Sequence, residues 1–102
     1  IANTEKPLER IEYIAMGIVE AELKHLLKNR RNKPLYLAIL KYANNRRWKE
    51  LLSVVRDEIG KVNNTSFSRA LKQLVKYSFI EKTADRYLVA DPVIKTTVMK
   101  RF

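Results

Sequence analysis

The hydrophobic period changes once within residues 65–92, and this change limits what the chain can fold into. In the first half, apolar side chains recur at the three- and four-residue spacing of a helix, and these are Phe67, Ala70, Leu71, Leu74 and Val75. In residues 79–90, two short apolar runs instead flank a polar segment, ThrAlaAspArg. Such runs predict two short strands joined by a turn. The segment therefore predicts a helix that leads directly into a β-hairpin.

The flanking sequence predicts further helices. Helical spacing of apolar residues predicts helices over residues 7–29, from Pro34 to Tyr42 or Asn44, over 48–59 and over 93–101. We interpret residues 44–47, AsnAsnArgArg, as a turn, and a short strand near Arg47–Trp48 as a third strand that could join the hairpin. The predicted fold is mainly α: a winged helix-turn-helix with a small β-hairpin wing, a long N-terminal helix and a short C-terminal helix. The predicted division is a connector helix in residues 1–31 and a winged-helix domain in residues 32–102.

Several residues are expected to end or orient these helices. Gly60 stands where a helix C-cap belongs, Asn64 or Thr65 is suited to cap the helix that ends near Tyr77, and Asp91 with Pro92 is suited to open the last helix. The long helix is expected to bury one face, made of Leu8, Ile11, Ala15, Ile18, Leu23, Leu26 and Leu27. The last helix is expected to bury Ile94, Val98 and Phe102.

The charge of the chain is strongly uneven. The net charge is +10, but residues 1–29 carry four basic and five acidic side chains, or −1. Residues 30–102 carry seventeen basic and six acidic side chains, or +11. A field of one sign over about seventy residues favours a polyanionic partner. That partner is double-stranded DNA or an acidic protein surface.

The basic residues suggest where DNA would bind. On the fourth predicted helix, residues 65–77, the side away from the apolar stripe carries Ser66, Ser68, Arg69, Lys72, Gln73 and Lys76. Arginine and glutamine can contact base edges with two hydrogen bonds, while lysine and serine more often contact phosphates. The amides at Thr65–Ser66 favour a phosphate at the helix N-terminus. Further candidates are Arg46, Arg47 and Lys49 before and within the preceding helix, and Lys82 and Arg86 beside the wing turn.

The wing turn argues in the other direction. Its tip is Ala84–Asp85, and a carboxylate there would repel phosphate. A second interpretation therefore stays open, in which the basic surface meets an acidic face of a protein and binds no DNA.

Residues 79–94, FIEKTADRYLVADPVI, carry a family signature. The run in which Ile80 and Lys82 are followed by Tyr87, Asp91 and Pro92 resembles the C-terminal winged-helix domain of archaeal STAND-type P-loop ATPases. The preceding LKQLVKYS, residues 71–78, matches the last helix of that domain, and residues 7–29 resemble its connector helix. The resemblance implies a regulatory or DNA-binding domain attached to, or packed on, a P-loop ATPase module.

The resemblance places ATP and Mg²⁺ in a longer parent protein and no cofactor in this chain. A GxxxxGK[ST] phosphate-binding loop is missing from the 102 residues, which contain only the glycines Gly17 and Gly60. The chain begins at Ile1, which we expect of a fragment or an excised domain. We expect no enzymatic activity from it.

Other kinds of site find little support in the sequence. His25 is the only histidine and the chain has no cysteine, so a zinc site is not expected. Asp57 and Glu58 are adjacent and diverge on a helix, so they do not form an acid–base pair. The aromatic residues Trp48 and Tyr87 are interpreted as core or half-buried residues and not as platforms for base stacking. Neither a membrane span nor a signal peptide is expected, and we expect a cytoplasmic protein. A dimer formed through helix 7–29 stays an open alternative, although its stripe is not strictly heptad.

Overall fold

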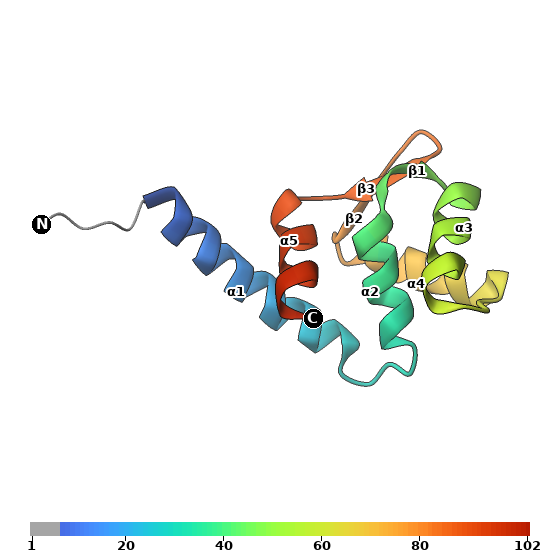
Figure 1. Cartoon of the computed structure of the whole chain (residues 1–102), viewed down its shortest axis with the longest axis horizontal. Helices are drawn as coiled ribbons and strands as arrows, with labels where there is room; N and C mark the ends of the chain where they lie inside the picture. Colours follow the sequence, from blue (N-terminus) through green and yellow to red (C-terminus); the bar gives the residue numbers. More distant parts are fainter. Residues whose placement is uncertain (1–6) are drawn as a thin grey trace, which may run out of the picture.

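A computed structural model describes residues 7–102, in which helices dominate (Figure 1). The order of elements is α1 (Pro7–Leu27), α2 (Lys33–Tyr42), β1 (Asn44–Arg47), α3 (Trp48–Ile59), α4 (Asn64–Lys76), β2 (Ile80–Thr83), β3 (Arg86–Val89) and α5 (Pro92–Arg101). The mainly helical class, the long first helix, the hairpin and the short last helix are confirmed. Residues 1–6 of the predicted connector, and the side chain of Leu8, lie outside the described residues.

The three strands form one antiparallel sheet in the order β1–β3–β2. The hairpin pairs Ile80 with Val89 and Thr83 with Arg86, so its turn contains only two residues. Residues 44–47 are not the turn that the sequence predicted. They form strand β1, which pairs with the edge of β3 that faces away from β2. The third strand is therefore present, but it begins three residues before Arg47 and ends at that residue. Asn45 takes a φ of 57° at an irregularity in this pairing, a conformation that asparagine tolerates better than most residues.

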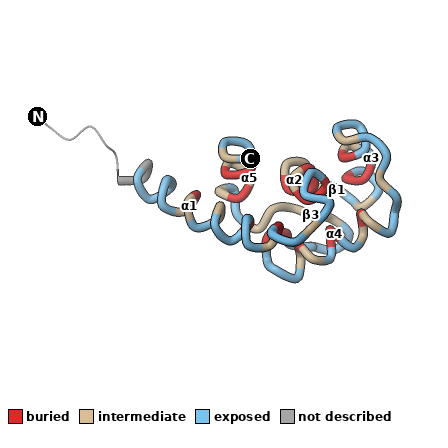
Figure 2. Tube along the Cα trace, turned by 90° about the horizontal axis from the view of Figure 1, so that it is seen from below, coloured by how far each residue is buried: buried red, intermediate tan, exposed pale blue. Residues whose placement is uncertain are grey.

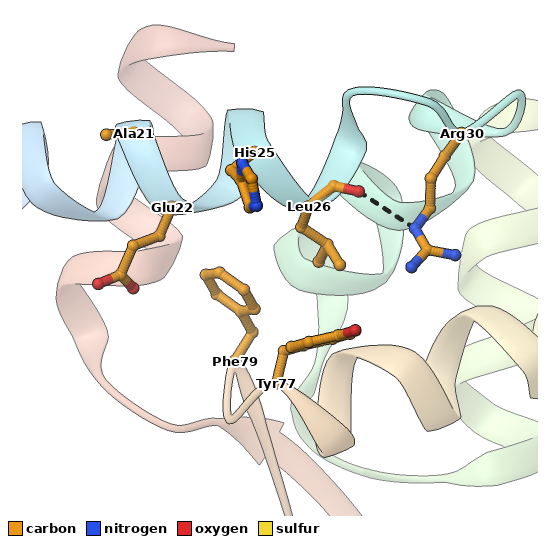
Figure 3. Close-up of a pocket in the computed structure, with 7 residues that line it drawn as sticks. All are labelled: Ala21, Glu22, His25, Leu26, Arg30, Tyr77 and Phe79. Atoms are coloured by element: carbon orange, nitrogen blue, oxygen red, sulfur yellow. Dashed lines mark hydrogen bonds between the residues drawn. The ribbon is translucent and has the colours of Figure 1, made fainter.

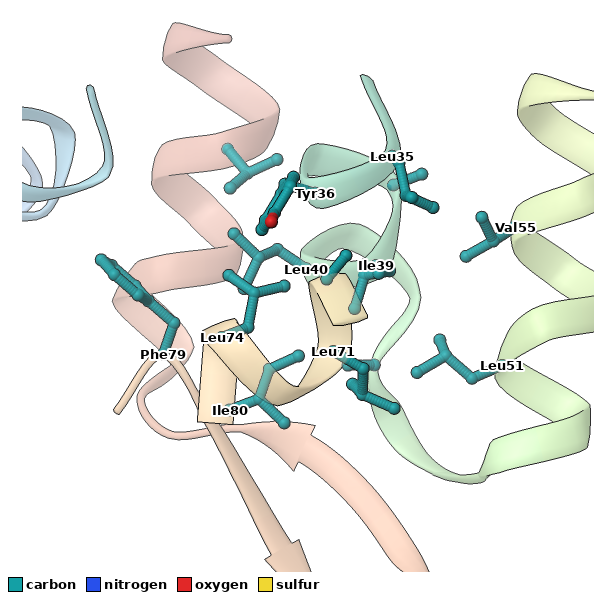
Figure 4. Packing of buried hydrophobic residues seen from close by; sticks show 14 of the residues in the cluster. Leu35, Tyr36, Ile39, Leu40, Leu51, Val55, Leu71, Leu74, Phe79 and Ile80 are labelled. Carbon is teal, nitrogen blue, oxygen red and sulfur yellow. The ribbon is translucent and has the colours of Figure 1, made fainter. Parts of the chain in front are cut away.

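The hydrophobic core lies between α2, α3, α4 and the base of the hairpin (Figure 4). Each element contributes the stripe that its period predicted: α4, for example, buries Phe67, Ala70, Leu71 and Leu74. The side chains of Phe79 and Ile80 are buried at the start of the hairpin. Their burial attaches the sheet to the helices. Trp48 at the start of α3 packs edge-on against Phe67, with ring centroids 5.3 Å apart.

Helix α1 lies beside α5, and its first half extends away from the rest of the molecule (Figure 1). Leu23 and Leu27 are buried in the common core, as predicted. Ile11 and Ile18 are not, because they are 62% and 56% exposed on what the helical spacing makes the opposite side of the helix. Exposed residues predominate along the first half of α1 (Figure 2). Met16 is buried in their place. The sequence offered two apolar faces on α1, and only one of them packs on its own domain.

Polar contacts hold α1 to α5. The Arg101 guanidinium donates to the Glu20 carboxylate at 2.9 Å and lies 5.0 Å from the centroid of the Tyr13 ring. In α5, Ile94 and Val98 are buried as predicted, whereas Phe102 is 42% exposed. Phe102 follows the last helical residue and lies at the rim of the packed face.

The helix ends follow the sequence with one correction. Gly60 ends α3 with a φ of 87°, and the Asp91 carboxylate accepts from the Val93 amide at 2.9 Å at the start of α5. Helix α4 is capped by Asn63 and not by Asn64 or Thr65, because the Asn63 side chain accepts from the Ser66 amide at 2.7 Å. The helix begins one residue earlier than its apolar period suggested. Within residues 7–102, no helix is long and apolar enough to cross a membrane.

Replacing Asn63 by alanine is expected to lower the free energy of unfolding by about 1 kcal/mol, since the cap is lost. Thr65→Ala serves as the matched control in the same turn and should change it by less than about 0.5 kcal/mol. Urea denaturation followed by circular dichroism measures both. A larger effect for Thr65→Ala would contradict the observed cap.

Acid is expected to weaken the contact between α1 and α5. Hydrogen bonds from Arg101 and then Lys24 lower the pKa of Glu20 below its ordinary value of 4.5. A carboxylate with a lowered folded pKa stabilises the fold fully above the unfolded pKa, and this contribution is lost as the pH falls through the folded value. The melting temperatures of wild type and Glu20→Gln should therefore differ at pH 6 and converge near pH 3.

The control for this experiment is Glu22→Gln. Glu22 is exposed and forms no ion pair within residues 7–102. Its variant should follow the wild-type dependence on pH, and a gap for Glu20→Gln that persists at pH 3 would contradict the role of the carboxylate.

Candidate nucleic-acid interface

Helix α4 and the hairpin together form a groove of about 360 Å³. Its rim is basic and polar, with Ser68, Lys72 and Lys76 from α4 and Lys82 from β2. Its floor is apolar and is made of Trp48, Leu71, Val75 and Tyr87. The predicted residues Ser68, Lys72, Lys76 and Lys82 are therefore brought to one place, although Lys82 is far from the others in sequence.

The cations of this region are placed by aromatic rings. The Lys82 amine lies 5.7 Å from the centroid of the Tyr87 ring, and the Lys76 amine lies 5.7 Å from that of Tyr77. Lys82 and Tyr87 are also opposite one another in the hairpin register. A ring face attracts a cation without neutralising it. The charge therefore stays available to an anion.

A second, open hollow of about 450 Å³ lies at the N-terminal end of α4. Thr65, Ser68, Arg69 and Lys72 line it together with Asn64. Ser68 and Lys72 belong to both hollows, so the two form a continuous surface along α4. We call Arg69, Lys72, Lys76 and Lys82 the α4 surface; all four are exposed and form no ion pair within residues 7–102.

Ser66 lies on a different side from this surface. Its amide already donates to Asn63, so it is not the vacant donor that the sequence suggested. It lines a third hollow, of about 410 Å³, with Arg31 and Lys61. These two basic residues were missed by the sequence reading because they lie in loops outside every helical pattern.

Three other predicted residues, Arg46, Gln73 and Arg86, form hydrogen bonds within the domain. Gln73 accepts a hydrogen bond from the Arg30 guanidinium at 3.4 Å. Arg46 and Arg86 donate to the backbone oxygens of Tyr42 and Asn45, at 3.1 and 2.9 Å. Lys49 is exposed in the first turn of α3.

Arg47 joins two parts of the fold. Its side chain pairs with Asp85 at the hairpin tip, with 3.1 Å between Nε and Oδ2. Its backbone amide donates to the Glu50 carboxylate at 2.9 Å, in the first turn of α3. Asp85, which the sequence suggested would repel phosphate, is thus occupied by a cation of the same domain.

Trp48 and Tyr87 are half-buried, within the core or half-buried placement that was predicted, and both line the α4–hairpin groove. Their strand and helix periods were read correctly. The groove was missed because it exists only once β3 is paired and α3 is packed against α4.

Another groove, of about 550 Å³, lies between α1 and the segment after α4 (Figure 3). His25 and Leu26 face Tyr77 and Phe79 across it. His25 is exposed, and no group of three or more potential metal ligands occurs within residues 7–102. This groove is apolar and has no assembled catalytic set.

The adjacent carboxylates Asp57 and Glu58 have separate roles. Glu58 accepts from the Lys41 amine at 2.7 Å and from the Tyr42 hydroxyl at 3.0 Å. The hydrogen bond from Lys41 lowers the pKa of Glu58, and the same bond raises the pKa of Lys41. Glu58 therefore connects α3 to α2, while Asp57 is exposed and takes no part.

Comparison with known proteins gives one informative match. A solved Walker-type ATPase of Pyrococcus abyssi superimposes with a TM-score of 0.71 and 27% sequence identity. The alignment covers 90% of this chain but only 26% of the ATPase. The chain therefore has the fold of about a quarter of an archaeal ATPase. No family model matches the chain, and no curated protein is similar to it.

Trp48 is the only tryptophan and so reports on the groove directly. Because Lys72, Lys76 and Lys82 surround it, iodide should quench its fluorescence more than caesium does. Relative to a free tryptophan amide, we expect the iodide-to-caesium ratio of quenching constants to rise roughly twofold or more at low salt. Lys72→Glu/Lys76→Glu should abolish the rise, whereas Lys28→Glu/Lys100→Glu, an equal charge change just after α1 and on α5, should preserve it. A wild-type ratio equal to that of the free amide would contradict a positive potential in the groove.

Proposed function

We propose that the chain is a winged-helix domain of an ATPase-like protein and that it binds double-stranded DNA through the α4 surface. The observation that carries this proposal is the grouping of Arg69, Lys72, Lys76 and Lys82 along one side of α4 and the adjoining hairpin. Each is exposed, and none is paired with a carboxylate within residues 7–102. Cations held in this way can neutralise phosphates at little cost in lost ion pairs.

The arrangement of elements supports the winged-helix part of the proposal. Helices α2, α3 and α4 surround one core, the hairpin follows α4, and β1 completes the sheet. In such a fold the last of the three helices lies in the major groove, with its N-terminal residues closest to the bases. In this proposal Arg69, with Thr65 and Ser68, contacts base edges, while Lys72, Lys76 and Lys82 contact phosphates. Arg46, Arg47, Lys49, Ser66, Gln73 and Arg86 remain lesser candidates.

The proposal separates DNA binding from nucleotide chemistry. ATP and Mg²⁺ would bind in a parent protein, outside these 102 residues, because the sequence contains no phosphate-binding GxxxxGK[ST] loop. The chain by itself would catalyse no reaction. A cytoplasmic location is part of the same proposal, since DNA and ATP meet there in archaeal cells.

A second candidate function is a regulatory domain that packs on a P-loop ATPase module without binding DNA. The Arg47–Asp85 ion pair favours it, since the tip of the short hairpin carries a carboxylate and this carboxylate is paired with a cation of the same sheet. A wing that enters the minor groove needs reach and a cationic tip. In this case the α4 surface would meet an acidic face of the module.

The deciding experiment is binding of the chain to random duplex DNA over a salt series. If the four cations of the α4 surface each neutralise one phosphate, the log–log slope should be about −3.6. Arg69→Glu/Lys72→Glu should remove most of the affinity at low salt and leave the circular dichroism spectrum unchanged. Lys28→Glu/Lys100→Glu makes the same change in net charge elsewhere and should weaken binding only slightly.

Two results would overturn DNA binding at this surface. Equal losses for both double variants would mean that net charge alone attracts DNA. No binding even at low salt would reject the proposal and favour the second candidate. The second candidate predicts that a P-loop ATPase module binds the chain and that Arg69→Glu/Lys72→Glu abolishes this binding.

A further inference from the structure

Helix α1 has two apolar faces on opposite sides. Met16, Leu23 and Leu27 are buried against the domain. On the other side, Ile11, Ile14 and Ile18 are exposed by 62%, 54% and 56%. A helix that is apolar on both sides is normally buried on both. The second face is therefore built for a contact that the chain alone does not make.

The exposed residues have the spacing of a helix–helix seam. Ile11, Ile14, Ile18 and Ala21 follow one another at intervals of three, four and three residues. This is the a/d spacing of a coiled coil, in which each side chain packs between four residues of a second helix. We call these four residues the α1 stripe. In the sequence the stripe predicted for this helix is not strictly heptad, because it combines residues of the α1 stripe with residues of the buried face.

We propose that the α1 stripe pairs two copies of this chain, with their α1 helices antiparallel. The charge distribution favours a second copy at this place. Residues 30–102 carry +11 and would repel a copy of themselves, whereas residues 1–29 carry only −1. The first half of α1 also extends away from the rest of the molecule, as Figure 1 shows, while its second half lies beside α5.

The antiparallel direction follows from the same charges. A helix of 21 residues is about 30 Å long, so antiparallel pairing holds the two basic parts at opposite ends of the seam. For charges beyond the C-terminal end of α1, including those of α4, that separation is several times the Debye length of about 8 Å at physiological salt, whereas α5 with Arg101 lies beside α1 itself. Parallel pairing would place the two +11 segments side by side.

The register follows from which residues it would bury. Ile14 opposite Ile18 of the second copy also places Ile11 opposite Ala21, and the seam is then apolar throughout. A shift by one heptad in one direction would set Ile11 against Lys28 and bury an amine. A shift in the other direction would set Ile11 against Ile14 and Ile18 against Pro7, and would leave Ala21 out of the apolar seam. In the preferred register Arg10 lies near Lys24 of the second copy, and the charge of Lys24 is already balanced by Glu20 at 3.2 Å.

The seam ends at the groove of Figure 3. Ala21 lines that groove with His25, Tyr77 and Phe79, and Tyr77 is 51% exposed there. Ile11 of the second copy would lie at the edge of this groove and cover part of it. The apolar contact thus continues from the helix onto the body of the domain.

Sedimentation equilibrium of the chain tests the proposal. The average mass should rise with concentration from the 12.0 kDa of one chain towards twice that value. Ile14→Glu/Ile18→Glu should weaken association by about a hundredfold or more, because the seam would bury carboxylates. Met99→Glu changes an equally exposed apolar residue on α5 and should associate like wild type. Ile14, Ile18 and Met99 are all exposed in the monomer, so the circular dichroism spectra of both variants should match that of wild type.

Disulfide trapping tests direction and register, since the chain has no cysteine of its own. An equimolar mixture of Ile11→Cys and Ala21→Cys chains should oxidise mainly to the mixed dimer, identified by mass spectrometry. Dimers of each variant with itself would instead indicate parallel pairing and overturn the arrangement. A wild-type chain that stays monomeric at every concentration would overturn the second copy, and the α1 stripe would then be left to a different protein, such as an ATPase module. DNA binding is measured separately and is not needed for any of these outcomes.

Discussion

The burial of one side of α4 is the constraint on which the rest of the structure depends. Phe67, Leu71 and Leu74 lie in the core between α2, α3 and the hairpin. Because a helix has only one orientation that buries this stripe, the direction of Arg69 and Lys72 is fixed as well. Only three residues separate the end of α4 from the start of the hairpin, and the buried side chains of Phe79 and Ile80 anchor the hairpin in the same core. The packing that stabilises the domain therefore also sets the shape and charge of its basic surface.

Local patterns were sufficient for most of the fold. The apolar period placed α3 at Trp48–Ile59, and the cap residues Gly60 and Asp91 are as predicted. The errors occurred where distant parts of the chain decide the outcome. Residues 44–47 look like a turn because they are polar, yet β3 presents an edge whose amides and carbonyls require partners. The two faces of α1 could not be separated from sequence, since only the position of α5 determines which one is covered.

The candidate site divided in the same manner. Lys72 and Lys76 belong to one helical face and were predicted together, whereas the approach of Lys82 depends on the hairpin register. Gln73 shared the predicted face but turns toward Arg30, which lies 43 residues away in the sequence. Side chains of one helix are grouped by period, but a hydrogen-bond partner from another element can withdraw any one of them. DNA binding by the grouped cations stays a prediction, for which the structure specifies the residues to change.

The ion pair between Arg47 and Asp85 links the length of the hairpin to the charge that the domain presents. The two residues meet because the turn has only two residues, and Arg47 is fixed in turn by the contact of its amide with Glu50. An insertion at the tip would carry Asp85 out of reach and leave the Arg47 guanidinium, whose side chain is already 60% exposed, without its carboxylate partner. The hairpin would then extend further from the domain, and the positive potential around Arg47 would rise as a result of the same change. A modest change in loop length could therefore convert a hairpin held against its own domain into one suited to contact a polyanion.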